Sequence, residues 1–497
     1  MTLVLLRQLP APGHISGHIL GRVLLALLWT PAASASASAL AAAAPIAIPL
    51  PSERPQAISA QSDDFLAALA QRDVGPGFIA RLAAAAIALP VLGERSEDVT
   101  AATAARDQAR SRLLPGLGLD FVGARTITRD LQLPTTQVEN LSPRRRNDVI
   151  GSVDQLLTDF GATSARVRAG DASADAARAE LDVARTAALL QLVESWFGML
   201  SAQTTDALLA SHVDRMKSLA GGAVLRFERG VDSGGDVARA RSYLAAAQSQ
   251  KIDNERRLRA AAARFNELFG EAPGPLVRPA VATQADPLVA GTVADRPELV
   301  SARAQAQAAE AALSAARSDR LPRLDARVSG SAYDVLRGRD PAYDVRAQVT
   351  LRQRFSVGGA EAARVAELAA RRRAARFAVD RVAAATLRER DTASADVDGL
   401  AASIAPLQDA YLESRRARDL FAEQFRVSRG TVFDLLRAEQ DLLNAALVLA
   451  RTTYDLDVAR LTLLARRGGL IENFGLTPAV APAVAPTVAP ARTDPQP

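Results

Sequence analysis

The residue types that most often carry catalysis or bind metals are nearly absent from this sequence. It contains no Cys, which excludes disulfides and a thiol nucleophile. Of its three His, His14 and His18 fall in an N-terminal stretch typical of a cleaved leader, so only His212 would remain in the mature chain. Too few His and Cys residues therefore remain to form a His/Cys metal site or a His-based catalytic pair. We expect no enzyme, metal or cofactor site and an ordinary helical role for His212, although chemistry by Asp, Glu and Ser stays open.

The formal net charge of +5 raises the question of a nucleic-acid partner. The Arg residues, however, alternate with Asp and Glu along helical stretches, as on a solvated helix surface. Aromatic residues make up only 4% of the chain, too few to form base-stacking platforms. We therefore expect no nucleic-acid binding.

The polar residues of greatest interest lie in a stretch that the chain contains twice. Residues 226–240 return in altered form as residues 424–438, with Asp236 matched to Asp434 at an offset of 434 − 236 = 198. Further upstream the offset changes, because Pro115 matches Pro322 at 322 − 115 = 207. These constant spacings indicate a tandem duplication with a loop of variable length after each Pro.

Each repeat contains two segments in which apolar and polar residues alternate. The clearest runs from Asp344 to Arg352, and the first repeat has a similar pattern at 117–121. Period two predicts strands with one apolar face, and the hairpins are expected at 114–160 and 321–355. Strands of about ten residues have the length of a tilted membrane-spanning β-strand. Alternation alone is equally consistent with a soluble hairpin packed on helices.

A long helical segment follows each hairpin. Gly161 in the first repeat and Gly358-Gly359 in the second allow the backbone to turn from strand into helix. Each segment would extend roughly 100 Å at 1.5 Å per residue. Glycines at 170, 198, 221 and 222 are expected to weaken the first helix, and Gly399 with Pro406 to kink or interrupt the second. Apolar positions recur every three or four residues, as in a coiled-coil partner helix.

In the duplicated stretch each long helix should stop and turn back as a helix–turn–helix tip. Each copy has a break, then a helix cap, then an Asp in the first turn of the returning helix. These residues are Gly230, Asp232 or Ser233, and Asp236 in the first copy, and Ser428, Gly430, Thr431 and Asp434 in the second.

The N-terminus has the features of a secretory leader. Arg7 and Arg22 precede an apolar core at 23–29 that is far short of the roughly 20 residues of a spanning helix.

The predicted segments are a signal peptide and cleavage region at 1–37, a mobile N-terminal segment at 38–61, the helical start of the first repeat at 62–113, a β-hairpin at 114–160, a long helical hairpin at 161–275, a linker at 276–293, a helix of the second repeat at 294–320, a β-hairpin at 321–355, a long helical hairpin at 356–469 and an Ala/Pro-rich tail at 470–497.

The four expected strands impose a condition on the fold class. They are too few to close a barrel, and an open edge is not tolerated in lipid, where every backbone polar group must be paired. Two copies would supply eight strands and three copies twelve, and both numbers can close. The sequence therefore predicts an α+β membrane protein in which tandem long helical hairpins form a tunnel and several copies share one barrel.

The twofold repeat, the Leu-Pro pairs that open the hairpins, the Phe355 to Gly359 stretch that ends the second and the paired tips resemble the TolC-like outer-membrane channel family. The resemblance covers about residues 62 to 469. It implies a homotrimer in outer-membrane lipid, with a shared 12-stranded barrel and a helical tunnel across the periplasm. The implied partners are a periplasmic adaptor protein and an inner-membrane pump, and no catalysis is expected.

The resemblance also assigns site residues. The implied adaptor-docking tips are Gly230, Val231, Arg426, Val427, Ser428 and Gly430. The implied periplasmic aperture contains Asp236, Asp434 and Arg437, where Asp434 and Arg437 could form ion pairs between subunits in place of an acidic ring. The strand–helix hinges are Pro115, Gly161, Pro322, Gly358 and Gly359.

Three functions stay open. The pattern around Asp236 and the Leu-Pro-Arg-Leu sequence at Leu321 resemble the subgroup serving type I secretion, which implies a passive exit duct for proteins and an ABC transporter as pump. The alternative within the family is a channel for multidrug or small-molecule efflux. The alternative outside it is a soluble periplasmic coiled-coil scaffold.

Overall fold

The computed structural model describes residues 46–73, 77–128, 145–280, 296–336, 342–353, 355, 357–427 and 429–476. The chain divides into two units, Met1–Ala43, which lies outside the described residues, and Ala44–Pro497, which is the subject below. The predicted signal peptide, most of the linker and most of the Ala/Pro tail also lie outside them.

Nine α-helices and four strands are found in the described part of the chain, beside two short 3₁₀ turns at Pro55–Ala57 and Ala60–Ser62. The first repeat contains α1 (Asp64–Ala70), α2 (Gly77–Ala88), α3 (Pro90–Ser111), β1 (Gly116–Arg125), β2 (Arg145–Thr158), α5 (Ala162–Glu228) and α6 (Gly234–Phe269). The second contains α7 (Pro297–Ser318), β3 (Arg323–Tyr333), β4 (Ala342–Arg352), α8 (Ala360–Arg426), α9 (Val432–Arg466) and α10 (Leu470–Asn473).

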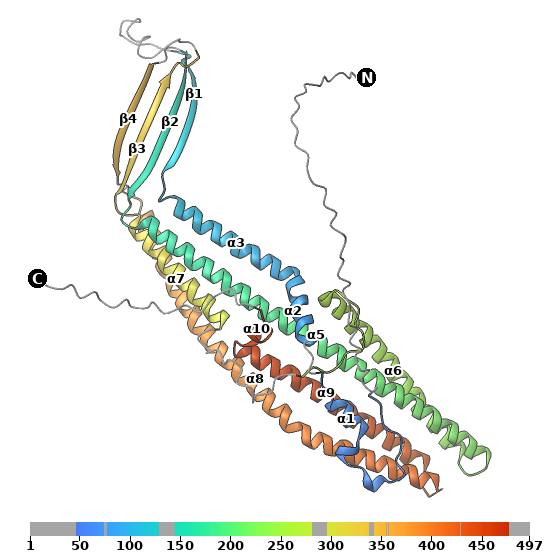
Figure 1. Cartoon of the computed structure of the whole chain (residues 1–497). Coiled ribbons are helices and arrows are strands. Elements are labelled where there is room, and N and C mark those ends of the chain that lie inside the picture. The colour runs from blue at the N-terminus through green and yellow to red at the C-terminus, as the bar shows by residue number, and fades with distance from the viewer. Residues whose placement is uncertain are drawn as a thin grey trace, which may run out of the picture. The chain divides into compact units, whose positions relative to one another are not determined.

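The duplication seen in the sequence is present in the structure. The helices α5 and α8 both have 67 residues and begin 360 − 162 = 198 residues apart. The helices α3 and α7 both have 22 residues and begin 297 − 90 = 207 residues apart. Each repeat is therefore a short helix, a hairpin and a long helical hairpin (Figure 1).

Both long helices are uninterrupted, which differs from the expectation for the second. The helix α8 continues through Pro406, so Gly399 and Pro406 do not break it. The neighbouring Leu407 packs against the main apolar core, and these contacts compensate for the hydrogen bond that Pro removes. In α5, Gly170 allows a close approach to α3, because a Cβ there would lie 2.9 Å from the Cα of Arg106.

The four strands form one antiparallel sheet in the order β1-β2-β3-β4. The β2–β3 pairing joins the two repeats, with Val153 opposite Val328. The outer strands β1 and β4 each have an edge that no described strand covers. The sheet lies where α5 and α8 begin (Figure 1).

The helices bury three apolar clusters. The largest contains Trp196, Phe197, Phe265 and Tyr454 and gathers residues from α1, α2, α5, α6, α8, α9 and α10. A second lies toward the tips and includes Met216, Val237 and Leu435. A third, smaller cluster joins α8 to α9. The long hairpins are thus held along their length by small and medium apolar side chains, as the Ala-rich sequence favours.

Candidate functional site

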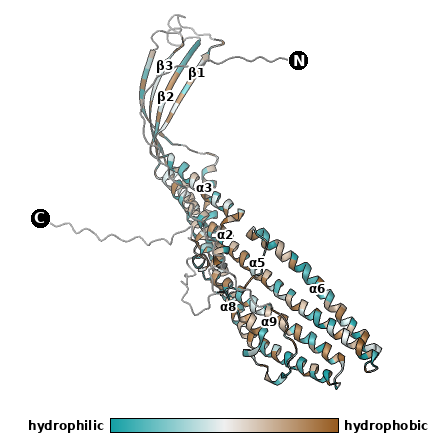
Figure 2. Ribbon diagram, turned by 45° about the vertical axis from the view of Figure 1, so that its right-hand side comes forward, coloured by the Kyte–Doolittle hydropathy of each residue, from teal (hydrophilic) through white to brown (hydrophobic). Residues whose placement is uncertain are grey.

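The sheet has one apolar face and one polar face. Leu117, Val153, Val328 and Ala347 form one apolar row across all four strands. The next row carries Asp154, Arg327 and Gln348, and the first two form an ion pair. The apolar side chains are solvent-exposed in the single chain, Leu117 by 83% and Val349 by 65%, and Figure 2 shows the alternation along the strands. An exposed apolar band of this kind requires a partner surface or lipid.

The first tip joins α5 to α6. The Val231 N–H donates to the carbonyl oxygen of Arg226 (2.9 Å), and the Arg226 guanidinium pairs with the Asp232 carboxylate (2.9 Å). Ser233 is the helix cap of α6, which selects it over the alternative Asp232. Local contacts thus close the turn, and the Val231 side chain is left 57% exposed.

The second tip joins α8 to α9. The N–H groups of Arg429 and Gly430 both donate to the carbonyl oxygen of Gln424 (2.9 and 3.1 Å). Arg426 donates two hydrogen bonds to Glu423 (3.0 and 2.8 Å), and the Val427 side chain is 49% exposed. The predicted docking residue Ser428 lies outside the described residues.

The two tips pack against each other. The guanidinium of Arg226 lies 4.5 Å from the ring centre of Phe425, and that of Arg239 lies 4.4 Å from the ring centre of Phe433. Such cation–π contacts stabilise a pair of helices at an exposed site. Because α6 also packs against α9, the predicted docking residues Gly230, Val231, Arg426, Val427 and Gly430 all lie on two adjoining tips.

The predicted aperture residues make local contacts within the chain. The Ser233 N–H and hydroxyl both donate to the Asp236 carboxylate (3.1 and 2.7 Å), and these bonds lower the pKa of Asp236. In the second repeat the Thr431 hydroxyl donates to Asp434 (2.6 Å). Both Asp residues therefore belong to helix caps. Arg437 is exposed, and no ion pair is found for it within the described ranges.

The predicted hinge residues lie at the junctions of strand and helix. Pro115 and Pro322 directly precede β1 and β3. Gly161 and Gly359 are the N-caps of α5 and α8, with φ of 91° and 73°. Gly358 lies in the turn before Gly359. The positive φ is a conformation that residues with a Cβ adopt at a cost, which accounts for glycine at both caps.

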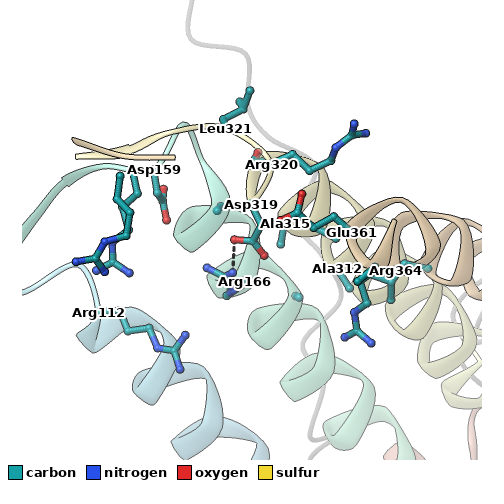
Figure 3. Close-up of a pocket in the computed structure, with 18 residues that line it drawn as sticks. Arg112, Asp159, Arg166, Ala312, Ala315, Asp319, Arg320, Leu321, Glu361 and Arg364 are labelled. Carbon is teal, nitrogen blue, oxygen red and sulfur yellow. Dashed lines mark hydrogen bonds and ion pairs between the residues drawn. The ribbon is translucent and has the colours of Figure 1, made fainter. Parts of the chain in front are cut away.

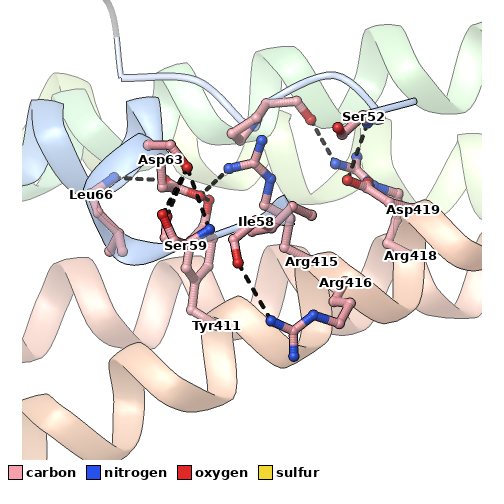
Figure 4. A network of polar contacts seen from close by, with 12 residues as sticks. Ser52, Ile58, Ser59, Asp63, Leu66, Tyr411, Arg415, Arg416, Arg418 and Asp419 are labelled. Atoms are coloured by element: carbon pink, nitrogen blue, oxygen red, sulfur yellow. Dashed lines mark hydrogen bonds and ion pairs between the residues drawn. The ribbon is translucent and has the colours of Figure 1, made fainter. Parts of the chain in front are cut away.

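A polar network between the N-terminal segment and α8 escaped the sequence analysis. Asp63 caps α1 through the N–H of Leu66 (2.8 Å), accepts the Tyr411 hydroxyl (3.2 Å) and pairs with Arg415 (Figure 4). Asp63 and Tyr411 are both buried. Burial, and next the Asp63 carboxylate, raise the pKa of Tyr411, so its hydroxyl stays protonated and donates.

The same network continues toward the tips. Arg418 donates to the carbonyl oxygen of Pro49 (2.8 Å), and Asp419 accepts the N–H of Ser52 (3.1 Å). The N–H of Ile48 donates to Ser211 of α5 (3.2 Å). The segment at 38–61 was expected to be mobile from its Ala and Pro content. In its described part, residues 46–61, it is instead fixed to α8 by hydrogen bonds to buried charges and to α5 by the hydrogen bond to Ser211.

Buried carboxylates connect the repeats. Glu439 of α9 is fully buried and pairs with Arg215 of α5 (2.7 Å) and Arg418 of α8 (3.3 Å). His212 lies beside this group, buried, with its pKa lowered mainly by burial, and it therefore stays neutral. The sequence contains no local sign of these contacts, because their partners are distant along the chain.

The two structural repeats coincide with a known sequence profile. The profile described as "Outer membrane efflux protein" matches residues 90–271 and 289–469, which is most of the chain and begins at α3. The chain belongs to the outer membrane efflux protein family.

Known proteins are similar to this chain at low sequence identity. Outer membrane efflux protein BepC of Brucella suis biovar 1 (strain 1330) is 24% identical over 327 residues, which cover 64% of this chain and 71% of BepC. The outer-membrane channel OprN matches with a TM-score of 0.68 at 21% identity, over 79% of this chain and 90% of that chain. VceC from Vibrio cholerae matches with a TM-score of 0.69 at 17% identity, over 79% and 96%.

Family membership confirms the predicted outer-membrane location and contradicts the alternative of a soluble scaffold. It also confirms the resemblance to TolC-like channels and the fold of helical hairpins with a four-stranded sheet. The structural neighbours are channels rather than enzymes. In the described residues no cluster of three or more His, Cys, Asp or Glu could hold a metal ion. Among the described helices, none is by itself both long and apolar enough to cross a membrane, and only the pair α2 and α3, bent by 57°, passes that test together.

Proposed function

We propose that this efflux protein works as a homotrimer whose twelve strands close one barrel, and that it is the exit duct of a tripartite export system. The observation that carries the proposal is the four-stranded sheet with one exposed apolar face and with two edges that no described strand covers. Lipid can cover the apolar face, whereas only strands of other copies can pair the backbone N–H and C=O groups at the edges. Three copies give twelve strands, a number within the range of outer-membrane barrels.

The long helices would form the periplasmic tunnel. At 1.5 Å per residue, the 67 residues of α5 and of α8 each extend about 100 Å. The first half of α8 exposes Phe377 by 72% and Leu387 by 43% in the single chain. These apolar side chains suit a contact with the next copy, because exposed apolar surface on a helix is stabilised by burial.

The tips would dock the periplasmic adaptor. Val231 and Val427 expose apolar side chains on two adjoining turns, next to Arg426 and the glycines Gly230 and Gly430. An apolar patch ringed by charge suits protein binding. Asp236 and Asp434 lie in the first turns behind the tips and Arg437 lies in the second turn of α9, where three copies would approach around the aperture. Pro115, Gly161, Pro322, Gly358 and Gly359 would be the points at which the helices move relative to the strands.

The cargo that we propose is protein exported by type I secretion, with an ABC transporter as pump, because of the sequence around Asp236 and Leu321. The alternative is efflux of small molecules, and the names of the family and of BepC favour it. Export assays in a strain that lacks its own channel distinguish the two. Secretion of a type I substrate without a change in drug accumulation would support the first, and the reverse result would support the second.

The barrel is tested by cysteine crosslinking, for which the absence of native Cys is an advantage. A variant with Leu119→Cys in β1 and Val349→Cys in β4 carries one thiol on each edge strand. With a flexible bis-maleimide reagent we expect products of one, two and three chains in the outer-membrane fraction. Each single variant is the control and should give no trimer. A ladder that ends at two chains, or recovery in a soluble fraction, would contradict the proposal.

A further inference from the structure

A cavity of about 740 Å³ lies where the sheet meets the helices, and arginines dominate its polar lining (Figure 3). It is bounded by α5, α7 and α8 and by the ends of β3 and β4. Its basic residues are Arg112, Arg166, Arg320, Arg323, Arg352 and Arg364, and its acidic residues are Asp159, Asp319 and Glu361. The lining itself thus carries six cations and three anions, and this cavity is called the basic vestibule below.

Half of these arginines have carboxylate partners. Arg166 pairs with Asp319, Arg323 with Asp325 (2.8 Å) and Arg364 with Glu367 (3.2 Å). Asp159, which lines the cavity, accepts hydrogen bonds from the N–H (2.7 Å) and the hydroxyl of Thr163.

The other three arginines are the ones available to a ligand. Among the residues that the structure describes, Arg112, Arg320 and Arg352 have no ion pair. All three are exposed side chains in a concave site. A guanidinium in this situation favours phosphate or carboxylate, to which it can donate two parallel hydrogen bonds.

The strand register gives a second, independent observation. Arg323 of β3 lies directly opposite Arg352 of β4. Like charges directly opposite each other in a sheet are destabilising, and among the described residues Asp325 forms an ion pair with Arg323 but not with Arg352. A bound anion between the two strands would offset this repulsion. The start of α8 also favours an anion at this place. Ala360 and Glu361 line the cavity, and no described side chain caps the helix N-terminus at Gly359.

The face of the sheet determines where the basic vestibule opens. Arg323 and Arg352 alternate with Leu324 and Leu351, which belong to the apolar face. If the apolar face contacts lipid, as the proposed barrel requires, the arginines point to the interior of the duct.

We propose that the basic vestibule binds phosphate or carboxylate groups inside the duct and makes the duct selective for anionic cargo. This inference rests on the proposed function for the direction in which the vestibule opens. The anion site itself is formed by one chain and does not depend on it.

Binding is tested with inorganic pyrophosphate as the probe, titrated calorimetrically into the full-length protein in detergent at low salt. We expect saturable binding of one pyrophosphate per chain. The variant Arg112→Gln, Arg320→Gln, Arg352→Gln should bind about tenfold more weakly or worse, because charge-assisted hydrogen bonds are lost. The matched control is Arg256→Gln, Arg257→Gln, Arg259→Gln, which removes three exposed charges from α6. It should bind as the unaltered protein does.

Selectivity is tested in planar bilayers from the reversal potential in a KCl gradient. We expect a preference for chloride that the vestibule variant reduces and the α6 variant leaves unchanged. Equal pyrophosphate affinity in all three proteins, or a cation preference that the vestibule variant does not alter, would overturn the inference. If no conductance forms at all, the duct proposal fails, whereas the titration still decides on the anion site. Should the triple variant not assemble, Arg352→Gln alone is expected to weaken binding in the same direction.

Discussion

At the scale of single residues, the most consequential feature is the charge buried between the helices. Asp457 of α9 is fully buried, and Arg278 donates to both of its carboxylate oxygens (2.6 and 3.0 Å). Arg278 also donates to the carbonyl oxygen of Leu69 (2.8 Å), so this pair fixes α1 and the end of the first repeat to α9. A buried pair of this kind is stable only while both partners are present.

We predict that Asp457→Asn lowers the free energy of unfolding by about 3–5 kcal/mol, because it leaves the Arg278 charge buried without compensation. The measurement is the guanidinium midpoint followed by helical circular dichroism in detergent. Asp455→Asn is the control two residues away, where the pair with Arg451 is exposed and long (3.6 Å). Its effect should stay within about 0.5 kcal/mol. Equal shifts for the two variants would show that Arg278 and Asp457 do not form a buried pair in solution.

At the scale of elements, the turns from strand to helix decide how the repeat is assembled. The second long helix begins after Gly359, which has a positive φ of 73°, whereas Gly358 beside it has no positive φ. No atom of the described residues would lie within 4 Å of a Cβ at either position. The two glycines therefore differ in backbone conformation and not in packing.

This difference gives a matched pair of variants. We predict that Gly359→Ala destabilises the protein by about 1–2 kcal/mol, the cost of a left-handed conformation for a residue with a Cβ. Gly358→Ala should be close to neutral. Thermal unfolding of both variants in the same detergent measures the difference. A larger loss for Gly358→Ala would mean that the turn has a different backbone conformation in the assembled protein.

The cap of α6 predicts a dependence on pH. The hydrogen bonds from Ser233 hold the pKa of Asp236 below its ordinary value. The ionised carboxylate therefore stabilises the cap above the ordinary Asp pKa of about 3.9, and this contribution is lost as the pH falls through the lower folded-state value. We expect the amides at the start of α6 to exchange faster below about pH 4 than intrinsic rates explain. Hydrogen exchange of Asp236→Asn, compared at each pH, should lack this change. An identical pH response in the variant would exclude Asp236 as its source.

At the scale of the whole molecule, the two faces of the sheet determine how copies of the chain and lipid are arranged. Val349 belongs to the exposed apolar face, and Gln348 next to it belongs to the polar face. The same substitution at these neighbouring positions therefore tests which face meets lipid.

We predict that Val349→Arg reduces assembly in the outer membrane, because an Arg on the lipid face is destabilising, by up to about 2–4 kcal/mol at the bilayer midplane. Gln348→Arg should assemble, since its side chain would lie on the polar face. Fractionation followed by crosslinking of the detergent extract measures the assembled trimer. Assembly of both variants, or failure of the Gln348 variant alone, would reverse the assignment of the faces.

The elements and their order could be predicted because their signals are local. Period-two alternation predicted the strands, and breaks with cap residues predicted the tips at 226–240 and 424–438. The constant offset predicted that α5 and α8 are equivalent. Each of these signals depends on residues within one or two turns of chain, where backbone preference and side-chain chemistry act directly. The family resemblance rests on the same local features.

What only the tertiary structure decided are the contacts between residues far apart in sequence. Asp63 and Arg415 are separated by 352 positions, and no local pattern predicts that burial would pair them. Arg323 faces Arg352 because the hairpin register sets them opposite each other, and α8 continues through Pro406 because its neighbours hold it. The physical reason is that the energy of a charge or of a Pro depends on its surroundings, and those surroundings form only when distant segments pack together.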